Sequence, residues 1–134
     1  MTAVRVPVPP AGTAAVYEKY VTRSAEDRPC VGVLAACRRT APGRYTDIRV
    51  SVGAAAETPQ RFPDLEAIAA DTDLGEDVRQ SIADGYAGRI ETLDDVRGSA
   101  WYRTEMVRVW VRRTLEAARR RADEVADVAA SAGA

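Results

Sequence analysis

The sequence predicts an α+β fold, in which an antiparallel β-sheet of three to four strands packs on about three helices as a two-layer sandwich. Runs rich in β-branched and aromatic residues fill the first half of the chain, and segments with helical apolar stripes fill the second half. This order favours separate layers over alternating βαβ units. The 134 residues provide one core of common size. We therefore expect a single domain over residues 1–134, with a core at about residues 4–121 and a frayed helical tail over residues 122–134.

Three stretches of the first half have the composition of strands. Residues 14–23 are rich in aromatic and β-branched residues and lack a helical stripe. Residues 30–37 are almost continuously apolar, as in a strand buried on both faces, and residues 45–52 alternate, as in a strand with one buried face. The last two are expected to pair through a turn at residues 42–43. Residues 4–10, which prolines interrupt, form an extended arm or an edge strand.

Three segments of the second half have helix signals. A short helix is expected from Pro63 through Ala70, with Leu65 and Ile68 facing inward. A second helix begins near Gly75, and its inward residues are Val78, Ile82 and Tyr86. The longest helix begins near Ser99, and its apolar stripe is Met106, Val107, Trp110, Val111, Thr114, Leu115 and Ala118.

Histidine is absent, and Lys19 is the one lysine beside 18 arginines. Without histidine there is no Ser-His-Asp or Cys-His catalytic system and no His-ligated zinc, and we expect no metal site. The formal net charge of −1 lacks the basic excess of proteins that bind nucleic acids. No window has the roughly 20 apolar residues of a membrane span, and the N-terminus lacks the apolar stretch of a signal peptide. We expect a cytoplasmic protein with no nucleic-acid or membrane partner.

Cys30 and Cys37 belong to one apolar run. As parts of a strand they lie about 23 Å apart, too far for a disulfide. We interpret both as small buried apolar residues, with a reactive thiol as the alternative. Trp101, Trp110 and Tyr86 occur at helical spacing and are assigned to the core, with a pocket lining as the alternative.

Acidic residues in or beside the strands are the candidates for acid–base chemistry. They are Glu18, Glu26, Asp47 and Glu57. A buried carboxyl group can act as a general acid or base, whereas an exposed one is solvated. The sequence does not select among them. Together with the single lysine, the candidate catalytic residues are Lys19, Glu18 and Asp47.

Residues 95–103 read Asp-Val-Arg-Gly-Ser-Ala-Trp-Tyr-Arg and lead into a helix with two arginines before Leu115-Glu116-Ala117. Here the chain resembles the C-terminal domain of the flavoprotein (medium) subunit of the carbon monoxide dehydrogenase and xanthine dehydrogenase family of molybdenum hydroxylases. Further segments agree in the same order: Arg5-Val6-Pro7, Tyr17-Glu18-Lys19-Tyr20, Val31-Gly32-Val33 and Thr58-Pro59-Gln60-Arg61. The resemblance covers about residues 4–121 and implies the same α+β sandwich.

In that family a preceding region cradles the FAD, and the C-terminal domain closes over part of the flavin. The chain begins at the arm that enters this domain, and it has neither a G-x-G-x-x-G nor a G-x-x-x-x-G-K-[ST] sequence. The resemblance therefore implies that the chain does not hold FAD by itself. We expect no cofactor.

The resemblance also implies a ligand-facing surface. Lys19 stands where the family has a lysine on the strand that faces the isoalloxazine ring, and the loop from Arg23 to Asp27 matches a loop near that ring. With Tyr17 and Tyr20 beside Lys19, these residues form the expected ligand-facing set. The alternative is ordinary surface charge, with Arg23 paired to Asp27.

The charged residues of the shared motif are expected to be structural. Asp95 is expected to cap a helix or to bind Arg103, and Arg97 belongs to the same turn.

Two functions remain open. One is a stand-alone domain recruited as a cofactor-independent enzyme of the isomerase or cyclase type, which acts on a small apolar metabolite, for example in secondary-metabolite biosynthesis. Such chemistry needs mainly a shaped apolar pocket, and the complete-looking chain favours this function slightly. The alternative is a non-catalytic accessory module of a split FAD-containing molybdenum hydroxylase. We expect no oxidoreductase activity from the chain alone, and as partners a small-molecule substrate and either a second copy, as a homodimer, or a partner subunit.

Overall fold

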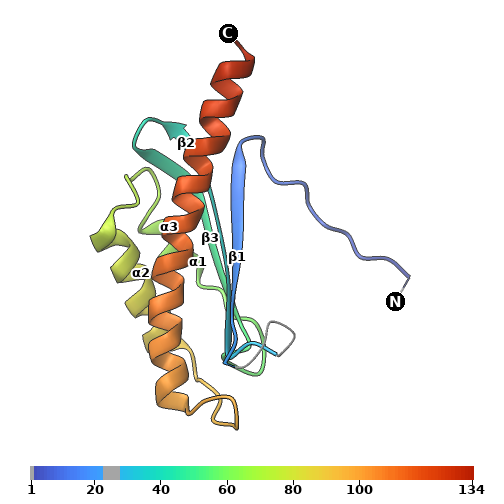
Figure 1. Cartoon of the computed structure of the whole chain (residues 1–134), viewed down its shortest axis with the longest axis vertical. Helices are drawn as coiled ribbons and strands as arrows, with labels where there is room; N and C mark the ends of the chain where they lie inside the picture. The colour runs from blue at the N-terminus through green and yellow to red at the C-terminus, as the bar shows by residue number, and fades with distance from the viewer. Residues whose placement is uncertain (1, 23–27) are drawn as a thin grey trace.

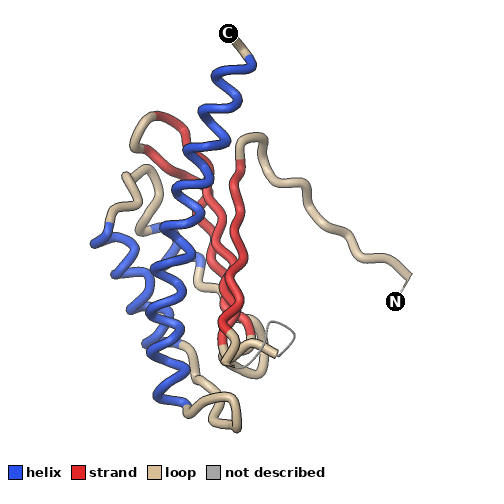
Figure 2. The backbone as a smooth tube through the Cα atoms, viewed as in Figure 1, coloured by secondary structure: helices blue, strands red, loops and turns tan. Residues whose placement is uncertain are grey.

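The computed structural model describes residues 2–22 and 28–134. Its elements are β1 (Thr13–Tyr20), β2 (Val31–Ala41), β3 (Arg44–Gly53), α1 (Pro63–Ala67), α2 (Glu76–Arg89) and α3 (Ala100–Ala132). The helices lie on one side of the sheet, and residues 2–12 form an extended arm that points away from them (Figure 1). Figure 2 shows the same division into one strand layer and one helix layer. The predicted two-layer α+β fold is confirmed.

The sheet has the strand order β1-β2-β3, and both pairs of neighbours are antiparallel. Successive side chains of a strand point to opposite faces, so every second residue faces the helices. The buried residues on this face of β2 and β3 include Val31, Val33, Ala35 and Cys37 on β2 and Tyr45, Ile48, Val50 and Val52 on β3. Cys30 and Cys37 are both buried and free, as predicted.

The short helix α1 buries different residues from those predicted. Leu65 is buried as expected, but Ile68 is 49% exposed and Glu66 is 5% exposed. The Glu66 carboxylate accepts a hydrogen bond from the Val50 N–H at 2.8 Å and two from the Arg61 guanidinium, each at 2.8 Å. These donors allow a carboxylate to be buried. The inward placement of Ile68 was wrong, because the side of this turn that faces the core carries Leu65, Glu66 and Ala69 instead.

The helices α2 and α3 begin and pack as predicted. α2 follows Gly75 and buries Ile82 and Tyr86, and the third predicted inward residue, Val78, is partly buried against the core. α3 follows Ser99, whose hydroxyl accepts a hydrogen bond from the Tyr102 N–H at 3.1 Å as an N-cap. The residues that α3 buries in its middle turns are Val107, Val111, Thr114, Leu115 and Ala118.

Of the three aromatic residues predicted for the core, Tyr86 is fully buried. Trp110 is half-buried and stacks on Tyr20, with the ring centroids 5.5 Å apart. Trp101 is 72% exposed, so its assignment to the core was wrong. It lies in the first turn of α3, out of phase with the buried stripe that starts at Arg103, and the helix therefore turns its ring to solvent.

The turn before α3 is held by Arg103, which is 1% exposed. Its Nη2 donates to Asp95 Oδ1 at 3.0 Å, and its Nε donates to the Cys30 carbonyl at 3.1 Å. Its Nη1 donates to the Gly98 carbonyl at 3.2 Å. The pairing of Asp95 with Arg103 that the sequence suggested is present. Arg97 lies on the exposed side of the turn, 3.8 Å from Asp95.

The last turns of α3 run past the end of the sheet (Figure 1). Ala122 is buried, and the carboxylate of Asp123 accepts a hydrogen bond from the Tyr45 hydroxyl at 2.7 Å. Arg39 pairs with Asp127 at 3.1 Å, and the chain is exposed from Asp127 onward. The β2–β3 hairpin thus contacts the helix as far as Asp127. Within the described ranges, no helix is long and apolar enough to cross a membrane.

Candidate functional site

The sheet face opposite the helices is the candidate site, and we call it the open face. The strand register places residues on it in rows across the three strands. The rows are Lys19, Gly32 and Gly53; Tyr17, Leu34 and Ser51; and Ala15, Ala36 and Arg49. The helices of the described chain all lie on the other side (Figure 1). A sheet in which one face is covered and the other is not leaves this face available to a partner.

Apolar and bare backbone surface dominates the open face. Tyr17 and Leu34 are direct neighbours across β1 and β2 and are 59% and 40% exposed. The Tyr17 side chain lies over Gly32. A Cβ atom on Gly32 would be only 2.5 Å from the Tyr17 hydroxyl oxygen. At Gly53 a Cβ would meet only the Gly32 carbonyl oxygen, at 4.0 Å. The open face is therefore flat and partly apolar at the end that carries Lys19.

The three candidate catalytic side chains lie apart. Lys19 is exposed on the open face, whereas Glu18, its neighbour in β1, points to the face that the helices cover. Asp47 lies on β3, six residues before the row of Lys19 and Gly53, which is about 20 Å along the strands. Its Oδ2 is paired with Nε of Arg38 at 2.9 Å. The structure does not bring these groups into one site.

Tyr20, at the end of β1, belongs to a cluster on the helix side. Its hydroxyl is hydrogen-bonded to the Tyr102 hydroxyl at 2.6 Å, and its ring stacks on Trp110. The hydrogen bond between the Tyr20 and Tyr102 hydroxyls, followed by partial burial, raises the pKa of the Tyr102 phenol. This cluster closes the edge of the core beneath β1.

The structure therefore separates the predicted ligand-facing residues. Tyr17 and Lys19 lie on the open face, and Tyr20 lies on the opposite face. Arg23 and Asp27, the other members of the set, fall outside the described residues.

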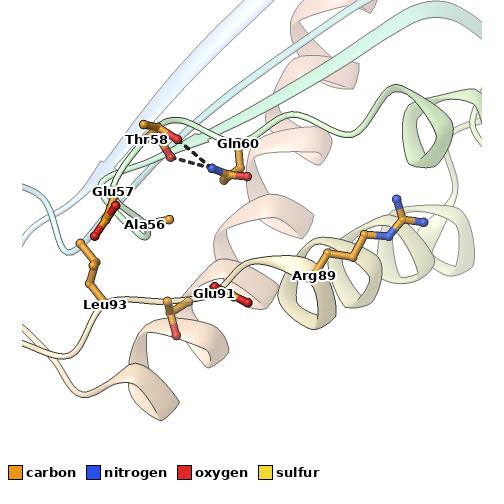
Figure 3. A pocket seen from close by; sticks show the side chains of 8 residues that line it. Ala56, Glu57, Thr58, Gln60, Arg89, Glu91 and Leu93 are labelled. Carbon is orange, nitrogen blue, oxygen red and sulfur yellow. Dashed lines mark hydrogen bonds between the residues drawn. The ribbon is translucent and has the colours of Figure 1, made fainter.

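A cleft of about 560 Å³ lies between the loop after β3 and the segment after α2. Glu57 and Thr58 come from the first of these segments and Glu91 from the second (Figure 3). The guanidinium of Arg89 points away from these side chains and pairs with Asp64 at 2.6 Å. Glu57 is the one predicted acid–base candidate in this cleft, and Thr58 and Gln60 belong to the segment that resembles the family.

A groove of about 450 Å³ follows the outer surface of α3 and includes Glu18 at its edge. Two ion pairs cross it, because Arg112 lies 2.8 Å from Glu76 and Arg79 lies 2.7 Å from Glu116. These pairs join α2 to α3 and give this part of the groove a structural role.

Comparison with known proteins agrees with the fold. The sequence profile of the CO dehydrogenase flavoprotein C-terminal domain matches residues 16–118. The chain is 30% identical over 115 residues to the nicotine 6-hydroxylase medium subunit of Paenarthrobacter nicotinovorans. This alignment covers 86% of the chain and 39% of that subunit. It is 32% identical over 109 residues to the glyceraldehyde dehydrogenase medium chain of Sulfolobus acidocaldarius, covering 81% of this chain and 38% of that one.

A solved structure of a relative has the same arrangement. It is the carbon monoxide dehydrogenase of Hydrogenophaga pseudoflava, in a form that lacks the Mo-pyranopterin moiety of the molybdenum cofactor. The superposition has a TM-score of 0.79 at 32% identity and covers 87% of this chain and 40% of that chain. The chain thus spans about two fifths of the length of these relatives. The profile match over most of the chain shows that the protein belongs to the CO dehydrogenase flavoprotein C-terminal domain family.

Proposed function

We propose that the chain is a non-catalytic accessory module of a split FAD-containing molybdenum hydroxylase. It docks its open face onto a partner polypeptide that carries the flavin. The observation that carries this proposal is the sheet with all described helices on one side and Tyr17 and Leu34 exposed on the other. Exposed contiguous apolar surface of this kind marks an interaction site in a soluble protein.

The length of the relatives supports a partner of this type. Their names describe medium subunits of hydroxylase and dehydrogenase complexes, and about three fifths of each relative lies outside the part that matches this chain. This chain matches only about two fifths of each relative. The surface that the other three fifths would provide therefore has to come from another polypeptide or from a longer form of this chain.

The described residues do not fit a whole FAD. A pyrophosphate is normally held at a helix N-terminus by free N–H groups and positive charge. The N-terminus of α2 is instead flanked by Asp73, which accepts from the Gly75 N–H at 2.9 Å, and by Glu76. At α3 the first N–H groups face Ser99 and Asp94. Acidic side chains at both positions repel phosphate, so the partner has to supply the nucleotide site.

The alternative of a cofactor-independent isomerase or cyclase has less support from the geometry. Lys19, Glu18 and Asp47 lie on different faces or at opposite ends of the sheet. Asp47 is neutralised by Arg38. A docking module requires none of these residues to meet.

Co-purification tests the proposal. The affinity-tagged chain is expressed in its own organism, and the purified material is analysed by mass spectrometry and for bound FAD by visible absorbance. We expect a stoichiometric flavoprotein of the molybdenum hydroxylase family. Leu34→Glu, at the centre of the open face, is expected to abolish its recovery, whereas Val128→Glu, at a more exposed apolar position on α3, is not. Recovery of the chain alone, or recovery of the same flavoprotein with Leu34→Glu, would overturn the proposal.

A further inference from the structure

The base of the N-terminal arm and the open face enclose a recess of about 160 Å³. Pro9 and Pro10 form its outer wall, and Ala15, Leu34 and Ala36 form its floor. The recess lies at the end of the open face opposite to Lys19, two rows along the strands.

The wall of the recess is fixed in place. The Pro10 carbonyl accepts two hydrogen bonds from Thr13, from the backbone N–H at 3.2 Å and from the hydroxyl at 2.6 Å. Gly12 makes the turn between them with a φ of 81°, a conformation that favours glycine. The two prolines have fixed φ angles. A preformed wall lowers the entropy that a ligand loses on binding.

The size and lining of the recess suit one apolar side chain. An apolar cavity of about 150 Å³ accommodates benzene, so this volume accepts a leucine or phenylalanine side chain. Pockets that take one such anchor commonly contribute most of the affinity of a protein interface.

The rim of the recess favours a ligand that carries a negative charge. Besides the apolar floor, the recess is lined by two charged residues, Asp47 and Arg49. The carboxylate of Asp47 is already paired with Arg38 at 2.9 Å. Arg49 is exposed and forms no ion pair with any described residue. Among the described residues, Arg49 is therefore the cation of the rim that lacks an ion-pair partner, and it complements a carboxylate.

We propose that this recess is an anchor site for the partner, into which the partner inserts one leucine or phenylalanine side chain while an adjacent carboxylate of the partner pairs with Arg49. The identity of the partner rests on the proposed function, but the ligand chemistry of the recess does not. It follows from the volume, the proline wall and the charge of Arg49.

The recess is tested on the isolated chain with N-acetyl-L-leucine, which carries both an isobutyl group and a carboxylate. Titration of ¹⁵N-labelled protein is expected to give saturable shifts of the amides of Ala15, Leu34 and Arg49. N-acetylglycine lacks the apolar group and is expected not to bind, and N-acetyl-L-leucinamide lacks the charge and is expected to bind more weakly. Absence of saturable shifts with N-acetyl-L-leucine, or equal shifts with N-acetylglycine, would overturn the proposal.

Two variants separate the apolar and the charged contributions. Ala15→Phe fills the recess and is expected to abolish the shifts, with Ala130→Phe on the exposed end of α3 as its control. Arg49→Gln is expected to weaken binding of N-acetyl-L-leucine about two- to fivefold, as for an exposed ion pair. It leaves N-acetyl-L-leucinamide unaffected, and Arg120→Gln on α3 changes neither. Unchanged binding in both Ala15→Phe and Arg49→Gln would contradict the assignment, and Arg49→Gln decides the matter if Ala15→Phe does not fold.

The same variants distinguish failure of the anchor from failure of the proposed function. If the flavoprotein is recovered with the wild-type chain and equally with Ala15→Phe, the anchor is wrong and the proposed function stands. If no flavoprotein is recovered but N-acetyl-L-leucine binds at the recess, the proposed function is wrong and the recess remains a binding site.

Discussion

The guanidinium of Arg103 and the carboxylate of Asp95 lie 3.0 Å apart, with Arg103 fully buried and Asp95 at the surface. The same guanidinium also donates to the Cys30 and Gly98 carbonyls. One side chain therefore ties the start of β2 to the turn before α3.

Arg103→Leu is expected to lower the free energy of unfolding by about 3–5 kcal/mol, because it leaves the Cys30 and Gly98 carbonyls without their donor. Urea denaturation measures the change. Arg97→Leu, on the exposed side of the same turn, is expected to stay within about 0.5 kcal/mol of the wild type. A similar small effect for Arg103→Leu would contradict the role of this side chain.

Acid is expected to weaken the same turn. The hydrogen bond from Arg103, followed by that from the Arg97 N–H, holds the pKa of Asp95 below its usual range. A carboxyl group with a lowered pKa in the folded state stabilises the fold above its unfolded pKa of about 4, and this stabilisation is lost as the pH falls through the folded value. Asp95→Asn should therefore reduce the stability at neutral pH and flatten its dependence on pH below about 4. Parallel pH profiles of the two proteins would contradict this.

The fold is expected to lose stability in alkali because of the buried Tyr86 hydroxyl. Its hydroxyl donates to the Val50 carbonyl at 2.8 Å and accepts from the Phe62 N–H at 3.0 Å. Burial raises the pKa of Tyr86 to about 12. Because the folded pKa exceeds the unfolded value of about 10, the stabilisation is complete below pH 10 and is lost as the pH rises towards 12. Tyr86→Phe is expected to lower the stability at pH 7 by about 1–3 kcal/mol and to remove that part of the alkaline slope.

The two thiols are expected to be inert in the native protein. Burial raises the pKa of Cys37 to about 11 and also raises the pKa of Cys30. The thiolate is the reactive form, so both pKa shifts and burial oppose alkylation. Iodoacetamide at pH 8 should modify neither thiol of the native chain and both after unfolding in guanidinium. Rapid native modification of Cys37 would contradict its burial.

Truncations of α3 are expected to show that the residues after Asp127 contribute little to stability, whereas the turn that contains Ala122 and Asp123 contributes measurably. Removal of residues 128–134, all exposed, should change the free energy of unfolding by less than about 0.5 kcal/mol. Removal of residues 122–134 also deletes buried Ala122 and the Asp123 acceptor of the Tyr45 hydroxyl, and it should cost about 2 kcal/mol or more. Equal stability of the two truncated chains would show that the contacts with Tyr45 contribute little.

The regular parts of the fold were predictable because they repeat. The alternation of Ile48, Val50 and Val52 and the stripe through Val107 and Leu115 predict buried faces without knowledge of the rest of the chain. The burial of Glu66 was not predictable in this way. It depends on Arg61 and on the Val50 N–H, and only the folded chain brings these donors together.

The candidate site was partly predictable. Tyr17 and Lys19 are two residues apart in a strand and therefore share a face, whereas Tyr20 is three residues from Tyr17 and faces the other way. That signal was present in the spacing. The recess was not predictable, because its wall depends on the turn at Gly12, which places Pro9 and Pro10 beside the sheet.

The single lysine of the chain lies on the open face, while every other basic side chain is an arginine. Amine-directed reagents at high pH therefore have one side-chain target besides the α-amino group. A fluorophore or cross-linker attached through Lys19 would sit at the edge of the proposed interface without any engineered cysteine. A label on Lys19 would therefore report on the binding of a partner to the open face.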